Sequence, residues 1–307
     1  MVIISWREAE RIFNSSGTCR HVYSTPLESG FFFENDEERK FALLLIALAA
    51  ADAGVTILAY AIMTNHFHFI VIGDRWMEFF LIFKERFSTY LSRHGRQGLM
   101  KKVFPKETEI TSLKQFCNEL VYVIRNPYVV SPEVNLLSYP WCSGYLYFNS
   151  LIDLIPSRSA AGMSYRELRP ITKSRDTSLP GWVRITDGAI NPACFVDYKL
   201  VEKLFRSPQE FLAMCFRNVE AQIEVAQRMG ERPFLKDEEM FRLIRSRIND
   251  KYGATDFQTL SPKDRTDILK YMKYDLASSN GQIARVLNRP QSEIDAIFPL
   301  TAKNPIP

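Results

Sequence analysis

The sequence has few cysteines and no closely spaced pair of them. Its five cysteines lie at positions 19, 117, 142, 194 and 215, so no two of them form a C-x-x-C pattern. The odd number and the wide spacing disfavour both a disulfide scaffold and a cysteine zinc site. We therefore expect a reducing compartment, which means a cytoplasmic protein.

Long apolar runs are also absent. The longest one, residues 41–51, is too short to span a bilayer, which requires roughly 20 residues in a helix. The first 14 residues mix charged and apolar side chains and contain no hydrophobic signal-peptide core. We expect no membrane partner.

A strong excess of one charge is missing as well. The chain has 39 Lys and Arg against 35 Asp and Glu, a net charge of +4. This balance neither requires nor excludes a polyanionic partner, so the location of the charges must decide. With 46% hydrophobic and 24% charged residues, the 307-residue chain is typical of a soluble globular protein, and its length suggests two domains.

The first 150 residues alternate between strand-like and helix-like segments. We predict strands at 18–24, 55–63, 66–72 and 101–104, and helices at 36–53, 76–94 and from 112 to Pro127. Asn35 is the expected N-cap of the first helix, and Thr64-Asn65 the expected turn of a hairpin. Ser112 and Gln115 match a capping box, and Pro127 is expected to end that helix.

The remainder of the chain divides into two segments that differ in proline content and periodicity. Residues 151–195 contain four prolines and little periodicity, and we interpret them as a linker or irregular connection. Residues 196–307 are helical in pattern. Within them, 280–287 and 291–298 predict two short helices around an Asn-Arg-Pro turn, preceded by a helix at 262–276, which is the spacing of a helix-turn-helix. In that arrangement Arg285 and Arg289 could bind phosphates, although Glu293 and Asp295 fit DNA poorly.

Two of only four histidines lie two residues apart in a predicted strand, at His66 and His68. Side chains at this spacing share one face of a strand, which suits two ligands of one metal ion. Two unrelated histidines on a half-exposed strand would give the same pattern, and an isolated H-x-H does not separate the two interpretations.

Tyr122 and Asn126 lie four residues apart on a predicted helix, and therefore on one helical face. A phenol and an amide oxygen placed in this way could act as a nucleophile and a third metal ligand. Taken alone, the same residues are explained by packing and by helix termination before a proline.

Together these segments resemble the single-tyrosine HUH transposases, in particular the REP-associated tyrosine transposases. Residues 59–73, AYAIMTNHFHFIVIG, resemble the metal-binding strand of that branch, and residues 122–127, YVIRNP, its nucleophile helix. Residues 138–143, SYPWCS, resemble the Y-P-W-S-S element that follows. Thr64 and Ile124 depart from the usual Pro and His, and the second departure puts a proton-shuttling role at position 124 in doubt.

The resemblance covers roughly residues 15–150 and implies an α+β architecture. It predicts a ferredoxin-like HUH nuclease domain over 1–150, with an antiparallel sheet and helices, a connection over 151–195, and an all-α DNA-binding region over 196–307. It also implies that His66, His68 and Asn126 bind Mg²⁺ or Mn²⁺ and that Tyr122 attacks a phosphate in single-stranded or hairpin DNA. The product would be a 5′-phosphotyrosine link and a free 3′-hydroxyl. A homodimer and association with the nucleoid would be compatible with this function.

Basic residues are concentrated between positions 84 and 106, where one acid, Glu85, accompanies seven of them. Aromatic residues, among them Tyr90, are interleaved, which is typical of surfaces that bind single-stranded nucleic acid. A solvated helix face with its aromatic residues in the core is the competing interpretation. The predicted DNA-binding residues in this segment are Lys84, Arg86, Tyr90, Arg93, Arg96, Lys101, Lys102 and Lys106.

Two other functions remain open from the sequence. A domesticated, non-catalytic DNA-binding regulator would share the fold, and a metal phosphoesterase would share the metal ligands without needing Tyr122. The sequence does not identify a general base for the tyrosine, whose pKa in water is about 10.

Overall fold

The computed structural model describes residues 4–24, 31–130, 137, 139–217, 223, 225, 226, 228, 229 and 235–299. The chain divides into two compact units, residues 1–215 and 216–307. Each unit is described by itself below.

A four-stranded antiparallel sheet forms the centre of the first unit, in the order β2-β3-β1-β4. The strands are β1 (Cys19–Ser24), β2 (Thr56–Ile62), β3 (Phe67–Ile72) and β4 (Pro105–Ile110). A two-residue turn at Thr64-Asn65 joins β2 to β3, and the Met63 amide donates to the His66 carbonyl across it. The predicted hairpin is therefore confirmed. The strand expected at 101–104 is instead a 3₁₀ turn at Leu99–Lys102, and β4 starts after it.

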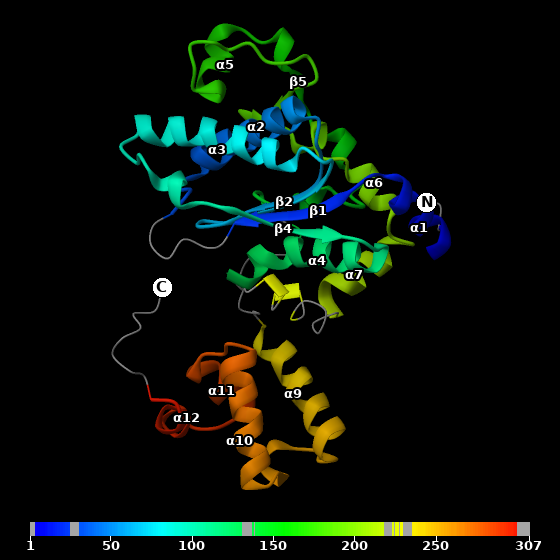
Figure 1. Cartoon of the computed structure of the whole chain (residues 1–307), viewed down its shortest axis with the longest axis vertical. Coiled ribbons are helices and arrows are strands. Elements are labelled where there is room, and N and C mark those ends of the chain that lie inside the picture. Colours follow the sequence, from blue (N-terminus) through cyan, green and yellow to red (C-terminus); the bar gives the residue numbers. More distant parts are fainter. Residues whose placement is uncertain are drawn as a thin grey trace. The chain divides into compact units, whose positions relative to one another are not determined.

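Helices cover both faces of this sheet (Figure 1). On one face lie α2 (Asp36–Ala53) and α3 (Trp76–Arg93), and on the other lies α4 (Leu113–Val130). The Asn35 side chain caps α2 as predicted, by accepting from the Glu38 amide. Pro127 does not end α4, which continues to Val130. Proline removes one backbone hydrogen bond from a helix, and here the helix tolerates that loss.

The sequence of β3 separates two kinds of side chain between the two faces. Phe67 and Phe69 point toward α3, where their rings pack against Phe79, Phe80 and Phe83. Because successive side chains of a strand alternate, His66 and His68 point the other way, toward α4. One face of the strand is therefore an aromatic core and the other carries imidazoles.

The segment expected to be a linker or an irregular connection is folded into the first unit. Residues 151–195 contain a small three-stranded sheet, the helix α5 (Tyr165–Thr172) and several 3₁₀ turns. The strands are β5 (Arg158–Ser159), β6 (Arg184–Thr186) and β7 (Ala189–Ile190). Val183, Ile185 and Ile190 are buried in the same core as the large sheet, and this apolar anchoring explains why the proline-rich stretch is not a linker.

The first unit also contains three further helices, α1 (Trp6–Ser15), α6 (Tyr198–Lys203) and α7 (Pro208–Arg217). α6 follows an isolated bridge between Val196 and Ile57 of β2. The boundary between the compact units thus falls after Cys215 rather than at the expected position 196.

The second unit is built from helices in its described part. These are α9 (Asp237–Tyr252), α10 (Pro262–Lys270) with a π-turn at Tyr271–Asp275, α11 (Asn280–Leu287) and α12 (Gln291–Ile297). α11 and the start of α12 agree with the predicted bounds. Ile283, Leu287 and Ile294 are buried in a separate core together with Ile244 and Ile248 of α9.

Within the described part of the chain, no helix is both long enough and apolar enough to cross a membrane.

Candidate functional site

Four polar side chains of the predicted site lie together between β3 and α4. His68 lies on β3 and His66 directly before it, while Tyr122 and Asn126 lie on successive turns of α4. The Nε2 atom of His66 lies 3.1 Å from Asn126 Oδ1, and the Nε2 atom of His68 lies 3.1 Å from Asn126 Nδ2. The Tyr122 ring centroid is 5.8 Å from that of His68. The fold thus brings the amide of Asn126 between the two imidazoles, with the phenol beside them.

Burial keeps both imidazoles neutral. Desolvation lowers the pKa of His66 to about 4, although the hydrogen bond with Asn126 opposes that change. Desolvation also lowers the pKa of His68 well below its usual value, and the neighbouring His66 and His21 add to the effect. A neutral imidazole has a free lone pair on one nitrogen, and a metal ion binds histidine in this neutral form.

The surroundings of His66 favour a cation. Its Nδ1 atom lies 2.9 Å from Asn65 Oδ1, while its Nε2 atom faces Asn126 Oδ1. A neutral imidazole carries a single N–H and can donate to only one of these oxygens. In the tautomer with the proton on Nδ1, the lone pair of Nε2 and Asn126 Oδ1 face each other, and these are two atoms that a cation could contact. The residues present therefore fit a divalent ion held by two imidazoles and one amide oxygen.

This donor set differs from a cluster of three or more His, Cys, Asp or Glu side chains. No such cluster arranged to hold a metal ion occurs among the residues that the structure describes. The third candidate ligand here is an amide, and amide oxygens suit Mg²⁺ and Mn²⁺ better than they suit softer metals.

Three further residues lie at this site that the sequence did not predict: His21, Tyr23 and Glu119. His21 and Tyr23 lie two residues apart on β1, and Tyr23 pairs directly with His68 across the sheet. The Tyr23 ring stacks on His68 with 6.1 Å between centroids, and His21 Nε2 lies 3.1 Å from His68 Nδ1. Glu119 accepts from His21 Nδ1 at 2.7 Å. The period-two spacing of His21 and Tyr23 was a usable signal, but only with knowledge that β1 pairs with β3.

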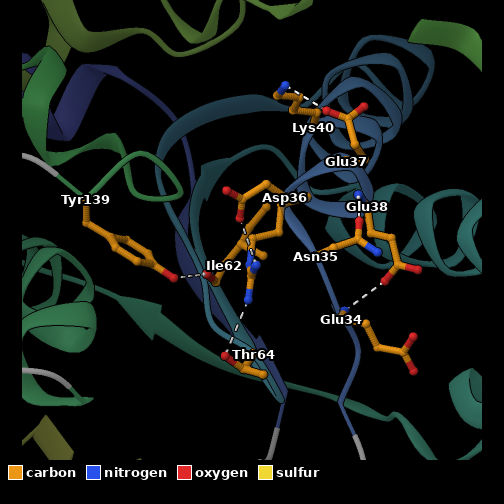
Figure 2. A network of polar contacts seen from close by, with 10 residues as sticks. Glu34, Asn35, Asp36, Glu37, Glu38, Lys40, Ile62, Thr64 and Tyr139 are labelled. Atoms are coloured by element: carbon orange, nitrogen blue, oxygen red, sulfur yellow. Dashed lines mark hydrogen bonds and ion pairs between the residues drawn. The ribbon is translucent and has the colours of Figure 1, made fainter. Parts of the chain in front are cut away.

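The Y-P-W element holds the hairpin that carries His66. The Ile62 amide donates to the Trp141 carbonyl, and the Tyr139 hydroxyl donates to the Ile62 carbonyl at 3.2 Å, as Figure 2 shows. Ser143 Oγ accepts from the Tyr60 amide at 3.1 Å. The element thus covers the outer edge of β2 and fixes the turn before the histidines. Ser138 lies outside the described residues.

The predicted basic cluster is divided by the sheet. Lys84, Arg86 and Arg93 lie on α3, on the face opposite the histidines. Lys106 pairs with Tyr23, which pairs with His68, so these three side chains share the face of the candidate site. Since neighbouring strands are about 4.8 Å apart, Lys106 lies roughly 10 Å along the sheet from His68.

Several members of the predicted cluster are engaged elsewhere in the fold. Lys84 donates to the Val103 carbonyl, Arg86 pairs with Asp52, and Arg96 pairs with Glu38 and Glu34. Arg93, Lys101 and Lys106 are exposed and form no ion pair with another described residue. The described side chains do not include that of Lys102.

Tyr90 lies in the core rather than on the surface. It is 9% exposed, and its ring packs between those of Phe41, Phe87 and His94. A ring in this position is not available for stacking on a base, so its predicted role in DNA binding finds no support in its position.

The two arginines predicted to bind phosphate in the second unit are both paired. Arg285 contacts Asp237 of α9 at 2.6 Å, and Arg289 contacts Glu293 of α12 at 2.7 Å. Carboxylates thus offset the positive charge of the α11–α12 turn.

Comparisons with known proteins give little further information. No protein-family profile and no curated protein matches the chain. Among solved structures, the chain is similar to a REP-associated tyrosine transposase bound to a REP hairpin, with 16% identity and a TM-score of 0.34. The match covers 54% of this chain and 89% of that one. The described fold of the chain is a mixed arrangement of helices and antiparallel sheets.

Proposed function

We propose that this protein is a metal-dependent single-strand DNA endonuclease and strand transferase, with Tyr122 as its nucleophile. The observation that carries the proposal is the meeting of His66, His68 and Asn126 within 3.1 Å contacts, beside the ring of Tyr122. The candidate metal ligands and the candidate nucleophile thus come from two distant parts of the sequence, with His66 and Asn126 separated by 60 residues.

His66, His68 and Asn126 would hold Mg²⁺ or Mn²⁺ in this proposal. When bound, such an ion polarises a phosphate and neutralises the charge that develops on it. Tyr122 Oη would attack the phosphorus, forming an O–P bond as the bond to the 3′ oxygen breaks. The phenol loses its proton, and the departing oxygen takes one up to become a 3′-hydroxyl. The phosphodiester energy is kept in the phosphotyrosine, so that strands can be rejoined.

Lys106 is the basic residue best placed to bind the DNA backbone next to this site. It shares the sheet face of His68, whereas the basic residues of α3 lie on the opposite face. A lysine on this face would contact the phosphate backbone of a strand bound at the site.

The direct test is to mix the protein with labelled single-stranded hairpin DNA and Mn²⁺ and to look for a covalent protein–DNA adduct. We expect an adduct that maps to the Tyr122 peptide and disappears in Tyr122→Phe. The matched control is Tyr23→Phe, because the Tyr23 ring also contacts His68 but is only 4% exposed. This variant should retain the adduct.

The alternatives give different outcomes in the same assay. Hairpin binding without an adduct, unaffected by His66→Ala, would identify a non-catalytic DNA-binding regulator. Cleavage that persists in Tyr122→Phe and is lost in His68→Ala would identify a phosphoesterase without a covalent step. Either result would refute the proposal.

A further inference from the structure

Behind the candidate metal ligands lies a fully buried chain of three side chains. Glu119 Oε2 is 2.7 Å from His21 Nδ1, and His21 Nε2 is 3.1 Å from His68 Nδ1. All three side chains have no exposed surface. This series of side chains runs from α4 through β1 to β3 and ends at Nδ1 of His68, whereas the proposed ligand atom is Nε2 of the same ring.

The arrangement of donors and acceptors in this series of side chains indicates where each proton lies, with the NH₂ group of Asn126 facing His68. The NH₂ group of Asn126 can only donate, so His68 Nε2 is the acceptor of that contact. A neutral His68 then carries its hydrogen on Nδ1 and donates it to His21 Nε2. His21 in turn carries its hydrogen on Nδ1 and donates to Glu119. The series ends at the Glu119 carboxylate, which can only accept a hydrogen bond. The donor at one end, the NH₂ group of Asn126, and the acceptor at the other end therefore require the same set of tautomers.

We propose that Glu119 and His21 are positioning residues that hold His68 in the Nδ1–H tautomer, with the Nε2 lone pair directed at the metal site. This inference rests on the proposed function, because it deepens the account of the same site. Ligating histidines commonly donate their other N–H to an outer partner that fixes ring orientation and tautomer. Here the partner is a second histidine, itself oriented by a carboxylate.

The spacing of residues along α4 explains how one helix can supply a candidate metal ligand, the proposed nucleophile and a positioning residue. Glu119, Tyr122 and Asn126 occur at positions i, i+3 and i+7, which lie on one helical face. Glu119 therefore reaches the inner end of the histidine chain, while Asn126 reaches its outer end and Tyr122 lies between them. The rings of His21 and Tyr122 are 6.3 Å apart, so the positioning residues also lie beside the proposed nucleophile.

The cost of burial supports a role beyond packing. A carboxylate removed from water is strongly unfavourable unless it is paired and hydrogen-bonded. His68 lies on β3. On the opposite face of β3, the equally buried positions are filled by Phe67 and Phe69. A purely structural requirement would be met by apolar side chains at His21 and Glu119 as well.

The first measurement is the tautomer of His68 in the metal-free wild-type protein. The chain has only four histidines, so selective ¹⁵N labelling gives a spectrum in which each imidazole can be assigned by substitution. We expect long-range ¹H–¹⁵N correlations at neutral pH to show His68 with its proton on Nδ1. A proton on Nε2, or on both nitrogens, would overturn the inference without any variant being made.

The second measurement is Mn²⁺ affinity by the paramagnetic resonance of the free ion. Removing the acceptor in Glu119→Leu or His21→Leu should weaken binding about 10- to 100-fold, the usual effect of losing an outer-shell partner. His21→Gln is the matched control, because its amide offers an oxygen to His68 and an N–H to Glu119. This variant should bind within a few-fold of wild type, which a role in packing alone would not predict.

The outcomes separate this inference from the proposed function. Unchanged Mn²⁺ affinity in Glu119→Leu, or equal loss in His21→Leu and His21→Gln, would refute the positioning role. If the leucine variants do not fold, the wild-type tautomer and the His21→Gln affinity still decide the question. A protein that shows the expected tautomer and affinities but forms no DNA adduct would refute strand cleavage and leave the positioning role standing.

Discussion

Acid should destabilise this protein through the buried histidines of its site. Burial lowers the pKa of His66 from 6.5 to about 4, so the folded state binds a proton less readily than the unfolded chain. Where the unfolded chain binds more protons, stability falls as the pH falls. The contribution of His66 is therefore complete above its unfolded pKa and is lost as the pH drops from 6.5 toward 4.

The size of the effect follows from the size of the shift. Each pKa unit corresponds to about 1.4 kcal/mol, so His66 alone should account for about 2 kcal/mol between neutral pH and about pH 5, and about 3 kcal/mol by about pH 4. The pKa of His68 is lowered in the same direction by the same cause, and its loss adds to this value. Carboxylates titrate mainly below about pH 5, so the comparison between about pH 7.5 and about pH 5 reports chiefly on the histidines.

The assay is urea unfolding in EDTA at a series of pH values, because a bound metal ion would stabilise the folded state separately. Wild type should lose at least about 2 kcal/mol on going from about pH 7.5 to about pH 5, and His66→Gln should lose correspondingly less. His94→Gln is the control, since His94 is exposed and its replacement should leave the acid sensitivity intact. A free energy of unfolding that is flat over this window would refute the view that His66 is buried in its neutral form.

Three further outcomes test other parts of the fold. Ser143→Ala removes the acceptor of the buried Tyr60 amide and should lower the free energy of unfolding by about 1–3 kcal/mol. The measurement is urea unfolding, and comparison with Ser143→Thr, which keeps the hydroxyl, would show whether the hydrogen bond is responsible. Phe83→Ala, in the aromatic core beneath β3, should cost about 3–5 kcal/mol in the same measurement, and a loss below about 1 kcal/mol would contradict the packing described. Arg285→Ala breaks only an exposed pair with Asp237 and should change the free energy of unfolding by less than about 1 kcal/mol, so that a larger change would point to a structural role for this arginine.

Local patterns predicted the elements that carry the site. The bounds of α2 and α11, the Asn35 cap and the β2–β3 hairpin all follow from residue types within one or two turns. The same short-range logic placed His66 with His68 on a strand face and Tyr122 with Asn126 on a helix face. Spacing alone does not say that these two faces meet, and the resemblance to a known family supplied that step.

The pairing of distant strands decided what could not be predicted. His21 and Tyr23 belong to a strand that the sequence predicts, but their place in the site depends on the register that sets Tyr23 opposite His68. Conversely, residues 84–106 form one basic segment in the sequence, but the basic residues of α3 and Lys106 lie on opposite faces of the sheet. The folding of residues 151–195 into the first unit likewise depends on long-range apolar contacts and not on their proline content.

The two faces of β3 give the strongest physical reason to regard this region as a functional site. Toward α3 the strand buries phenylalanines against phenylalanines, an arrangement that stabilises the fold by apolar burial alone. Toward α4, His66 and His68 lie against the amide of Asn126, and His68 also contacts His21 of β1, whose partner is the Glu119 carboxylate. The side chains of Glu119, His21 and His68 are fully buried. Desolvation makes such a layer less stabilising than an apolar one of equal volume. A fold that fills one face of a strand with aromatic residues and the other with linked polar groups is less stable than one with two apolar faces, and the proposed metal site would account for polar residues on the second face.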